Sequence, residues 1–154
     1  MIGHEKVLEL RKRLEDKTQK KCIPVWHKSR GKEEFLKLCD EYDYVGLGGI
    51  VPKEITPQEY KYFPLFIKEA HRRKAKIHAL GFTKQKELPK YHFDSVDSSS
   101  WASGNRFGHV YEFMSGTLKK HERPQGMKLK SQKEVAMHNF SEWVKFQEYA
   151  KKYL

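Results

Sequence analysis

The chain has 154 residues, the length of one domain, and 13% of them are aromatic. This aromatic content excludes a disordered chain, because disordered chains lack the large apolar groups that form a core. Lys and Arg number 31 against 20 Asp and Glu, which gives a formal net charge of +11. The excess predicts an anionic partner, nucleic acid first and anionic lipid second; a Lys-rich solvated surface is the alternative.

The two cysteines, Cys22 and Cys39, have no CxxC or other paired ligand spacing. This argues against a zinc knuckle, and isolated cysteines are typical of a reducing compartment. The first residues contain no apolar signal core, and no segment approaches the ~18 apolar residues of a membrane span. We therefore expect a cytoplasmic protein with no membrane partner, no metal and no other cofactor.

The first predicted elements are a helix and a short strand. Val7, Leu10 and Leu14 recur at helical spacing among charged residues and predict an amphipathic helix. The apolar run at 22–26 predicts a strand, in which Pro24 suits an edge position or a bulge because it cannot donate a ladder hydrogen bond.

The next elements repeat this order. A short helix is predicted from residue 32, and the apolar run at 44–51 predicts a strand buried on both faces. Thr56 and Glu59 form a capping box pattern that predicts a helix start. Pro64 is expected to kink or split that helix.

Helix and strand continue to alternate toward the C-terminus. The remaining predicted segments are strands at 76–82 and 91–97, a turn-rich segment at 103–108, a short strand at 109–113, a basic, weakly structured stretch at 117–133, and a last helix at about 139–154. Alternating strands and helices are the pattern of parallel α/β folds. We predict a single α/β domain that forms half of a TIM-type barrel, with four to five mostly parallel strands and its core at 22–115.

Glycines interrupt the apolar segment Gly46-Leu-Gly-Gly-Ile50. Glycine lets a ligand approach the backbone and leaves N–H groups unshielded. A dinucleotide loop is excluded, because no third glycine opens a helix at the required spacing and Pro52 follows. Gly48, Gly49 and Ile50 are thus candidate ligand contacts, and close packing of strands is the alternative.

Two carboxylates, Asp94 and Asp97, lie near the end of the strand predicted at 91–97. A carboxylate at a strand end can act as a nucleophile or as a general acid or base, so both are candidate catalytic residues. Side chains alternate along a regular strand, so the two are expected to point to opposite faces. Asp97 can alternatively form a turn with the serines that follow it.

Three histidines, His27, His78 and His92, lie on or beside predicted strand ends. A three-histidine metal site is one interpretation, and simple hydrogen bonding is the commoner role of such residues. His27 and His78 can instead hydrogen-bond a heterocyclic base.

These segments resemble the C-terminal half of the tRNA-guanine transglycosylases, over about residues 22–115. Five segments correspond in the same order. Ile23-Pro-Val-Trp-His27 stands for the family's Gly-Ile-Val-Gln, and Gly48-Gly-Ile-Val-Pro-Lys-Glu54 stands for its Gly-Gly-Leu-Ala-Val-Gly-Glu. His78-Ala-Leu-Gly-Phe-Thr83 stands for its Met-Gly-Val-Gly, Phe93-Asp-Ser-Val96 for its Phe-Asp-Cys-Val, and Ser103-Gly-Asn-Arg-Phe-Gly108 for its Ser-Gly-Arg-Asn-Gly. The chain is also similar to short phage-type homologues linked to 7-deazaguanine modification of nucleic acids.

The resemblance implies roles for particular residues. It makes Asp94 the nucleophile that attacks the sugar C1′ and holds a covalent nucleic-acid intermediate while one base replaces another. It places Gly48, Gly49 and Ile50 around the base. It also implies that the turn of Ser103, Gly104, Asn105 and Arg106 contacts the nucleic acid. The expected activity is exchange of a guanine-type base in tRNA or DNA for a modified guanine base, a 7-deazaguanine.

The chain departs from the family in several places. It lacks the Cys-rich zinc site, Ser95 replaces a Cys, and Asp97 replaces a Leu. A complete eight-strand barrel usually needs about 250 residues, so we expect a homo-oligomer or a partner chain that completes the barrel. The alternatives are a non-catalytic subunit that binds nucleic acid or a partner, and a barrel fragment that serves a phosphorylated sugar.

Overall fold

A computed structural model describes residues 3–82, 84–122 and 131–153. Its centre is a parallel sheet with the strand order β1-β2-β3-β4, and a separate antiparallel pair, β5-β6, follows in the chain. The strands are β1 (Val25–Trp26), β2 (Tyr44–Leu47), β3 (Lys76–Ala79), β4 (Ser95–Val96), β5 (Val110–Met114) and β6 (Thr117–His121). The α/β class and the four parallel strands are therefore confirmed.

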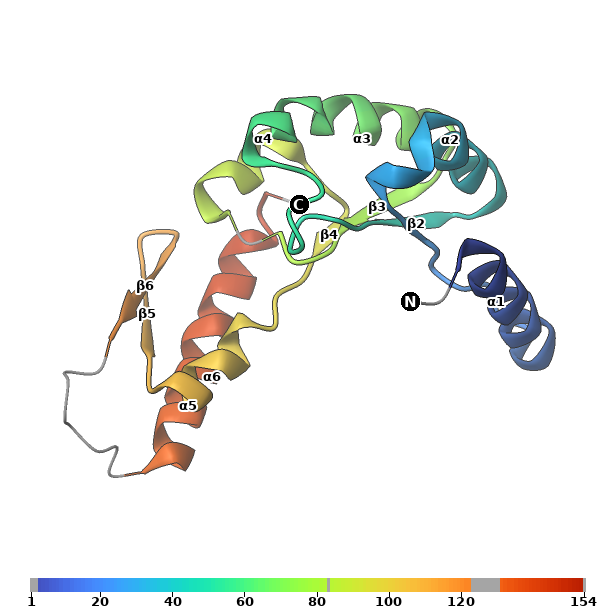
Figure 1. Cartoon of the computed structure of the whole chain (residues 1–154). Helices are drawn as coiled ribbons and strands as arrows, with labels where there is room; N and C mark the ends of the chain where they lie inside the picture. Colours follow the sequence, from blue (N-terminus) through green and yellow to red (C-terminus); the bar gives the residue numbers. More distant parts are fainter. Residues whose placement is uncertain (1–2, 83, 123–130, 154) are drawn as a thin grey trace.

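Helices precede, connect and follow these strands. The α-helices are α1 (His4–Thr18), α2 (Gly31–Glu41), α3 (Phe63–Arg72), α4 (Leu88–Tyr91), α5 (Ser100–Phe107) and α6 (Gln132–Ala150), and the 3-10 helices are η1 (Lys28–Arg30), η2 (Pro57–Tyr62) and η3 (Gln85–Glu87). Figure 1 shows α2, α3 and α4 on one side of the parallel sheet. Helix α1 stands at one end of the sheet, and α5, α6 and the β5-β6 hairpin stand at the other.

The sheet therefore has one covered side and one open side. Val45, Leu47, Ile77 and Ala79 have no exposed surface, because they alternate toward α2 and α3. In the described part of the chain no helix is layered over the opposite side (Figure 1). We call that surface the open side of the sheet.

The core beneath the helices is unusually aromatic. Phe63, the first residue of α3, lies with its ring centroid 4.8–5.7 Å from the rings of four neighbours. Those neighbours are Tyr60, Phe82, Tyr91 and Phe93. This cluster joins η2, α3, α4 and the ends of β3 and β4, so it fixes the helices over the sheet.

Prolines set two local features as predicted. Strand β1, which follows Pro24, is an edge strand of the sheet. The helix predicted from Thr56 is split into η2 and α3 just before Pro64, because proline lacks the N–H that a continuing helix needs.

Predicted segments after residue 100 also differ in the structure. The turn expected at 103–108 lies mostly in α5, and β6 occupies the start of the stretch expected to be weakly structured at 117–133, whose residues 123–130 lie outside the described residues. The last helix begins at Gln132 rather than near residue 139, because the Ser131 hydroxyl accepts a hydrogen bond from the Glu134 N–H at 3.2 Å and caps it.

Helix α6 is joined to the hairpin by buried polar side chains. Asn139 is fully buried; its Oδ1 accepts from the Tyr111 N–H at 2.8 Å and its Nδ2 donates to the His109 carbonyl at 2.9 Å. Glu142 accepts from the Phe113 N–H at 2.7 Å. These bonds pair backbone groups of the hairpin that otherwise lose water without a partner.

Glu59 provides a pH-dependent contribution to stability. Its carboxylate accepts from Lys28 Nζ at 2.5 Å and from the Thr56 N–H at 2.9 Å, and these contacts, that of Lys28 first, lower its pKa from 4.5 to about 2. A lowered folded-state pKa stabilises the fold fully above pH 4.5, and the contribution is lost as the pH falls toward about 2. We expect the stability difference between wild type and Glu59→Gln, measured by urea unfolding, to shrink over that window. A constant difference contradicts the assignment.

Candidate functional site

The open side of the sheet carries a row of residues in register. Val25 pairs with Gly46, Gly46 with His78, and His78 with Ser95, so these four residues lie side by side across all four strands. The next row, which includes Trp26, faces the helices, as the contacts of the Trp26 ring with Phe35 and Phe66 show. The Val25–Ser95 row therefore faces the open side.

A chain of polar contacts runs along this open side. The Tyr44 hydroxyl is hydrogen-bonded to Ser95 Oγ, and Ser95 Oγ lies 2.5 Å from His78 Nδ1. On its other edge, His78 Nε2 lies 3.6 Å from Asp97 Oδ1. One arrangement of protons satisfies all of these contacts. Tyr44 donates to Ser95, Ser95 donates to His78 Nδ1, and the Nε2–H of His78 faces the Asp97 carboxylate.

Asp97 lies just beyond β4, at the carboxyl end of the sheet where parallel folds gather functional groups. Its Oδ1 accepts from the Gly81 N–H at 2.5 Å. Its other oxygen has no hydrogen-bond partner among residues 3–82, 84–122 and 131–153, and the side chain is 58% exposed. Asp97 thus presents one fixed and one available oxygen on the open side.

Asp94 lies on the opposite, helix-covered side. Its Oδ2 accepts from the Ile77 N–H at 2.7 Å and contacts His71 Nε2 of α3 at 2.8 Å, and its side chain is 23% exposed. The carboxylate pairs a strand N–H where β4 begins, which is a structural role. The structure therefore separates Asp94 from the polar chain that contains Asp97.

His27 and Glu54 form a second polar pair at the carboxyl ends of β1 and β2. His27 Nδ1 lies 3.1 Å from Glu54 Oε2. A side chain on Gly48 would place its Cβ 2.8 Å from Val25 Cγ1 and 3.0 Å from the His27 ring. The space beside Gly48 is therefore filled by neighbouring side chains, which is the packing alternative for this glycine.

The other residues of the glycine segment differ in orientation. Gly49 has a φ of +87° and its backbone approaches Glu54, so it allows the tight turn after β2. Ile50 is buried and belongs to the hydrophobic core. The contact of Gly48, Gly49 and Ile50 with a base stays a prediction.

The segment Ser103–Arg106 lies within α5. Gly104 is buried against α6, where an added Cβ would lie 2.3 Å from Asn139 Nδ2 and 2.9 Å from the His109 carbonyl oxygen. Gly104 therefore permits close packing of α5 on α6. The side chains of Ser103, Asn105 and Arg106 lie outside the described part of the structure.

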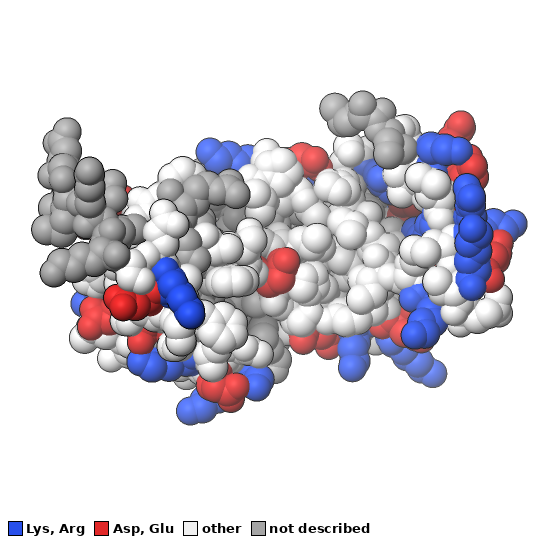
Figure 2. All heavy atoms as spheres, turned by 90° about the horizontal axis from the view of Figure 1, so that it is seen from below, with Lys and Arg blue, Asp and Glu red and all other residues white. Residues whose placement is uncertain are grey.

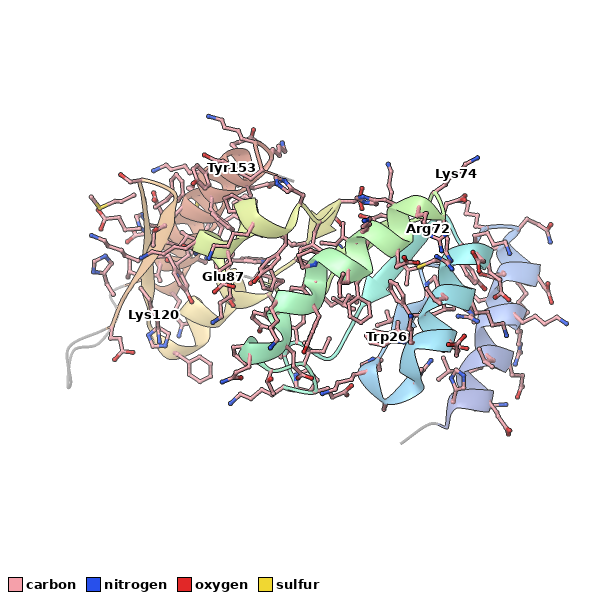
Figure 3. All side chains as sticks on the ribbon, turned by 90° about the horizontal axis from the view of Figure 1, so that it is seen from above. Trp26, Arg72, Lys74, Glu87, Lys120 and Tyr153 are labelled. Carbon is pink, nitrogen blue, oxygen red and sulfur yellow. The ribbon has the colours of Figure 1, made fainter. Side chains whose placement is uncertain are left out.

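A cavity of about 370 Å³ adjoins Asp97. It lies between the end of β4, the start of α5 and one face of α6, and Ser95, Val96, Asp97, Trp101, Phe140 and Trp143 are among its lining residues. A larger cavity, of about 550 Å³, lies on the helix side between α2, η2 and α3, where Trp26 lines it (Figure 3). That larger cavity contains none of the candidate catalytic residues.

The charge distribution separates two kinds of surface. Figure 2 views the open side and shows a mostly uncharged centre, with both basic and acidic residues toward the edges and Lys and Arg most prominent at the end formed by α1. The uncharged centre is suited to the apolar part of a ligand, and the Lys and Arg at the α1 end are suited to an anionic part.

The reactive groups of the open side are a carboxylate and an imidazole. Among the described residues, no three His, Cys, Asp or Glu side chains form a group that could hold a metal ion, so His27, His78 and His92 are not gathered into one. Burial raises the pKa of the Cys39 thiol to about 11, which keeps that thiol protonated and unreactive. The arrangement is suited to nucleophilic or acid–base chemistry by Asp97.

Several residues of this site are not among those that the sequence patterns indicate. Tyr44 and Ser95 can be found from strand alternation, because they lie two residues from Gly46 and Asp97. Glu54 ends the glycine-rich segment that was compared with the transglycosylases. Phe140 and Trp143 lie more than 40 residues along the chain from Asp97, and no local pattern connects them with it.

Comparison with known proteins finds no matching family model, no matching curated protein and no matching solved structure. No helix among the described residues is both long enough and apolar enough to cross a membrane.

Proposed function

We propose that this chain is half of a TIM-type barrel that exchanges a guanine-type base in nucleic acid for a 7-deazaguanine, with Asp97 as its nucleophile. The observation that carries the proposal is the position of Asp97 at the carboxyl end of β4, on the open side, with one oxygen held by Gly81 and the other available. The ordered motifs that resemble the transglycosylases supply the reaction class.

The proposed reaction consists of two displacements at the sugar. Asp97 attacks C1′, the bond from C1′ to the base nitrogen breaks, and the departing base keeps the electron pair and takes up a proton. The nitrogen of the incoming base then loses its proton, attacks C1′ and releases Asp97 as a carboxylate. The exchange involves no oxidation or reduction, and His78, whose Nε2 lies 3.6 Å from Asp97 Oδ1, is the neighbouring group that can carry a proton.

The geometry favours Asp97 over Asp94 for this role. The resemblance assigns the nucleophile to Asp94, but that carboxylate contacts His71 of α3 and is 23% exposed, against 58% for Asp97. Asp97 faces the side where a substrate can approach. In the proposal, Asp94 ties β3 to α3 and Asp97 performs the chemistry.

The open side supports a second chain in the assembly. Parallel sheets are almost always covered on both faces, and here the helices of the described residues cover one of them. In the proposal, a second copy or a partner chain supplies the missing strands and encloses the substrate. The net charge of +11 supports a nucleic acid as that substrate.

The test is incorporation of labelled guanine into guanine-containing RNA and DNA oligomers by the purified chain. We expect the label to enter at least one of them, and oligomers without guanine to remain unlabelled. Binding of the oligomers without incorporation supports a non-catalytic nucleic-acid-binding subunit instead. If the chain neither binds the oligomers nor incorporates the label, the result contradicts both functions.

A further inference from the structure

We propose that the cavity beside Asp97 is a stacking pocket for one extruded nucleobase. We call it the aromatic pocket; its lining includes Val96, Asp97, Trp101, Phe140 and Trp143. Its volume of about 370 Å³ lies in the range of small-molecule sites. The identification of the bound nucleobase as a guanine-type base rests on the proposed function, whereas the assignment of the pocket rests on its geometry.

The walls of the pocket are aromatic rings that the fold leaves exposed. Trp101 of α5 is 40% exposed and Phe140 of α6 is 55% exposed, and their ring centroids lie 5.8 Å apart in an edge-to-face arrangement. Both side chains line the pocket and therefore present apolar ring surface to its interior. Stacking on aromatic side chains is the usual way in which proteins hold a single unpaired base.

The floor of the pocket carries the groups that a base edge needs. Asp97 and Ser95 line it together with Val96, so hydrogen-bond acceptors and a hydroxyl lie beside apolar surface. Trp143, which also lines the pocket, has a buried indole N–H with no acceptor in the described part of the chain. Because this N–H has almost no accessible surface, Trp143 contributes ring surface to the pocket and not a hydrogen-bond donor.

The position of the pocket matches the proposed chemistry. A base held between the end of β4 and α6 lies beside Asp97, which lines the pocket and has one oxygen held by the Gly81 N–H. A base must leave the nucleic-acid stack before an enzyme can act on its bond to the sugar. The aromatic pocket therefore acts as the place that receives the extruded base.

The test measures binding of guanosine and of a guanine-containing single-stranded oligomer by isothermal titration calorimetry. Trp101→Ala and Phe140→Ala are each expected to weaken binding by about 5- to 150-fold, the range found when a base loses one stacking partner. Trp101→Phe keeps a ring and is expected to retain most of the affinity. Phe107→Ala is the matched control, because Phe107 is an exposed aromatic of the same helix that does not line the pocket.

The outcomes separate the pocket from the exchange reaction. Loss of binding in Trp101→Ala and Phe140→Ala but not in Phe107→Ala supports the pocket, even if wild type exchanges no guanine. Unchanged binding in both pocket variants overturns the pocket, whatever the exchange assay shows. Absence of binding by wild type also overturns it. If Trp101→Ala does not fold, Phe140→Ala and Trp101→Phe carry the test.

Discussion

Phe63→Ala is expected to lower the free energy of unfolding by about 3–5 kcal/mol, the usual cost of truncating a buried Phe. The Phe63 side chain is 1% exposed and its ring contacts the rings of Tyr60, Phe82, Tyr91 and Phe93. The substitution leaves a cavity where η2, α3 and α4 meet the sheet, and stiff rings on several sides cannot easily close it. Urea unfolding followed by circular dichroism measures the change.

The matched control is Leu65→Ala, two residues along the same helix. Leu65 is 61% exposed, so we expect a change of no more than about 0.5 kcal/mol, as is usual for a surface substitution. Equal losses in both variants contradict the view that the aromatic cluster holds α3 to the sheet.

The order of the strands and helices along the chain can be predicted, because local sequence signals agree with the tertiary structure. The apolar run that contains β2 is buried by helices on one side and by neighbouring strands at both edges. Pro24 and Pro64 fix an edge strand and a helix start, because a missing N–H has the same effect in any context. Each of these signals depends on few residues, so it can be recognised from the sequence alone.

Other elements depend on contacts that are distant in sequence. The strand predicted at 91–97 shrinks to β4, because residue 91 ends α4 and His92 adopts a left-handed φ of 50°. The turn predicted at 103–108 becomes a helix because Gly104 packs against Asn139 of α6. A Ser-Gly-Asn sequence is typical of turns, and tertiary packing overrides that preference here.

The candidate site was predicted in part. Strand alternation indicates that Asp94 and Asp97 face opposite sides, and in the structure Asp94 contacts His71 of α3 while Asp97 accepts from the Gly81 N–H beyond β3. Alternation alone does not tell which side the helices cover, so the sequence does not choose between the two carboxylates. That choice depends on α3, whose His71 contacts Asp94.

Asp97→Asn is expected to lower the rate of base exchange by at least about 10³-fold, the scale of loss when a group that acts directly in catalysis is replaced. The amide retains an oxygen for the Gly81 N–H, so the local backbone contact persists. It lacks the negative charge that attacks C1′, so no covalent intermediate forms. Single-turnover incorporation of labelled guanine measures the rate, and a denaturing gel detects the intermediate in wild type.

Asp94→Asn is the matched control, because its amide oxygen can still accept from the Ile77 N–H on the helix-covered side. We expect this variant to lose some stability through weaker contact with His71 and to keep exchange within about tenfold of wild type, since a positioning change costs far less than loss of the nucleophile. The reverse pattern, with exchange lost in Asp94→Asn and kept in Asp97→Asn, assigns the nucleophile to Asp94. That result also requires β4 to move so that Asp94 reaches the open side, because its carboxylate now faces α3.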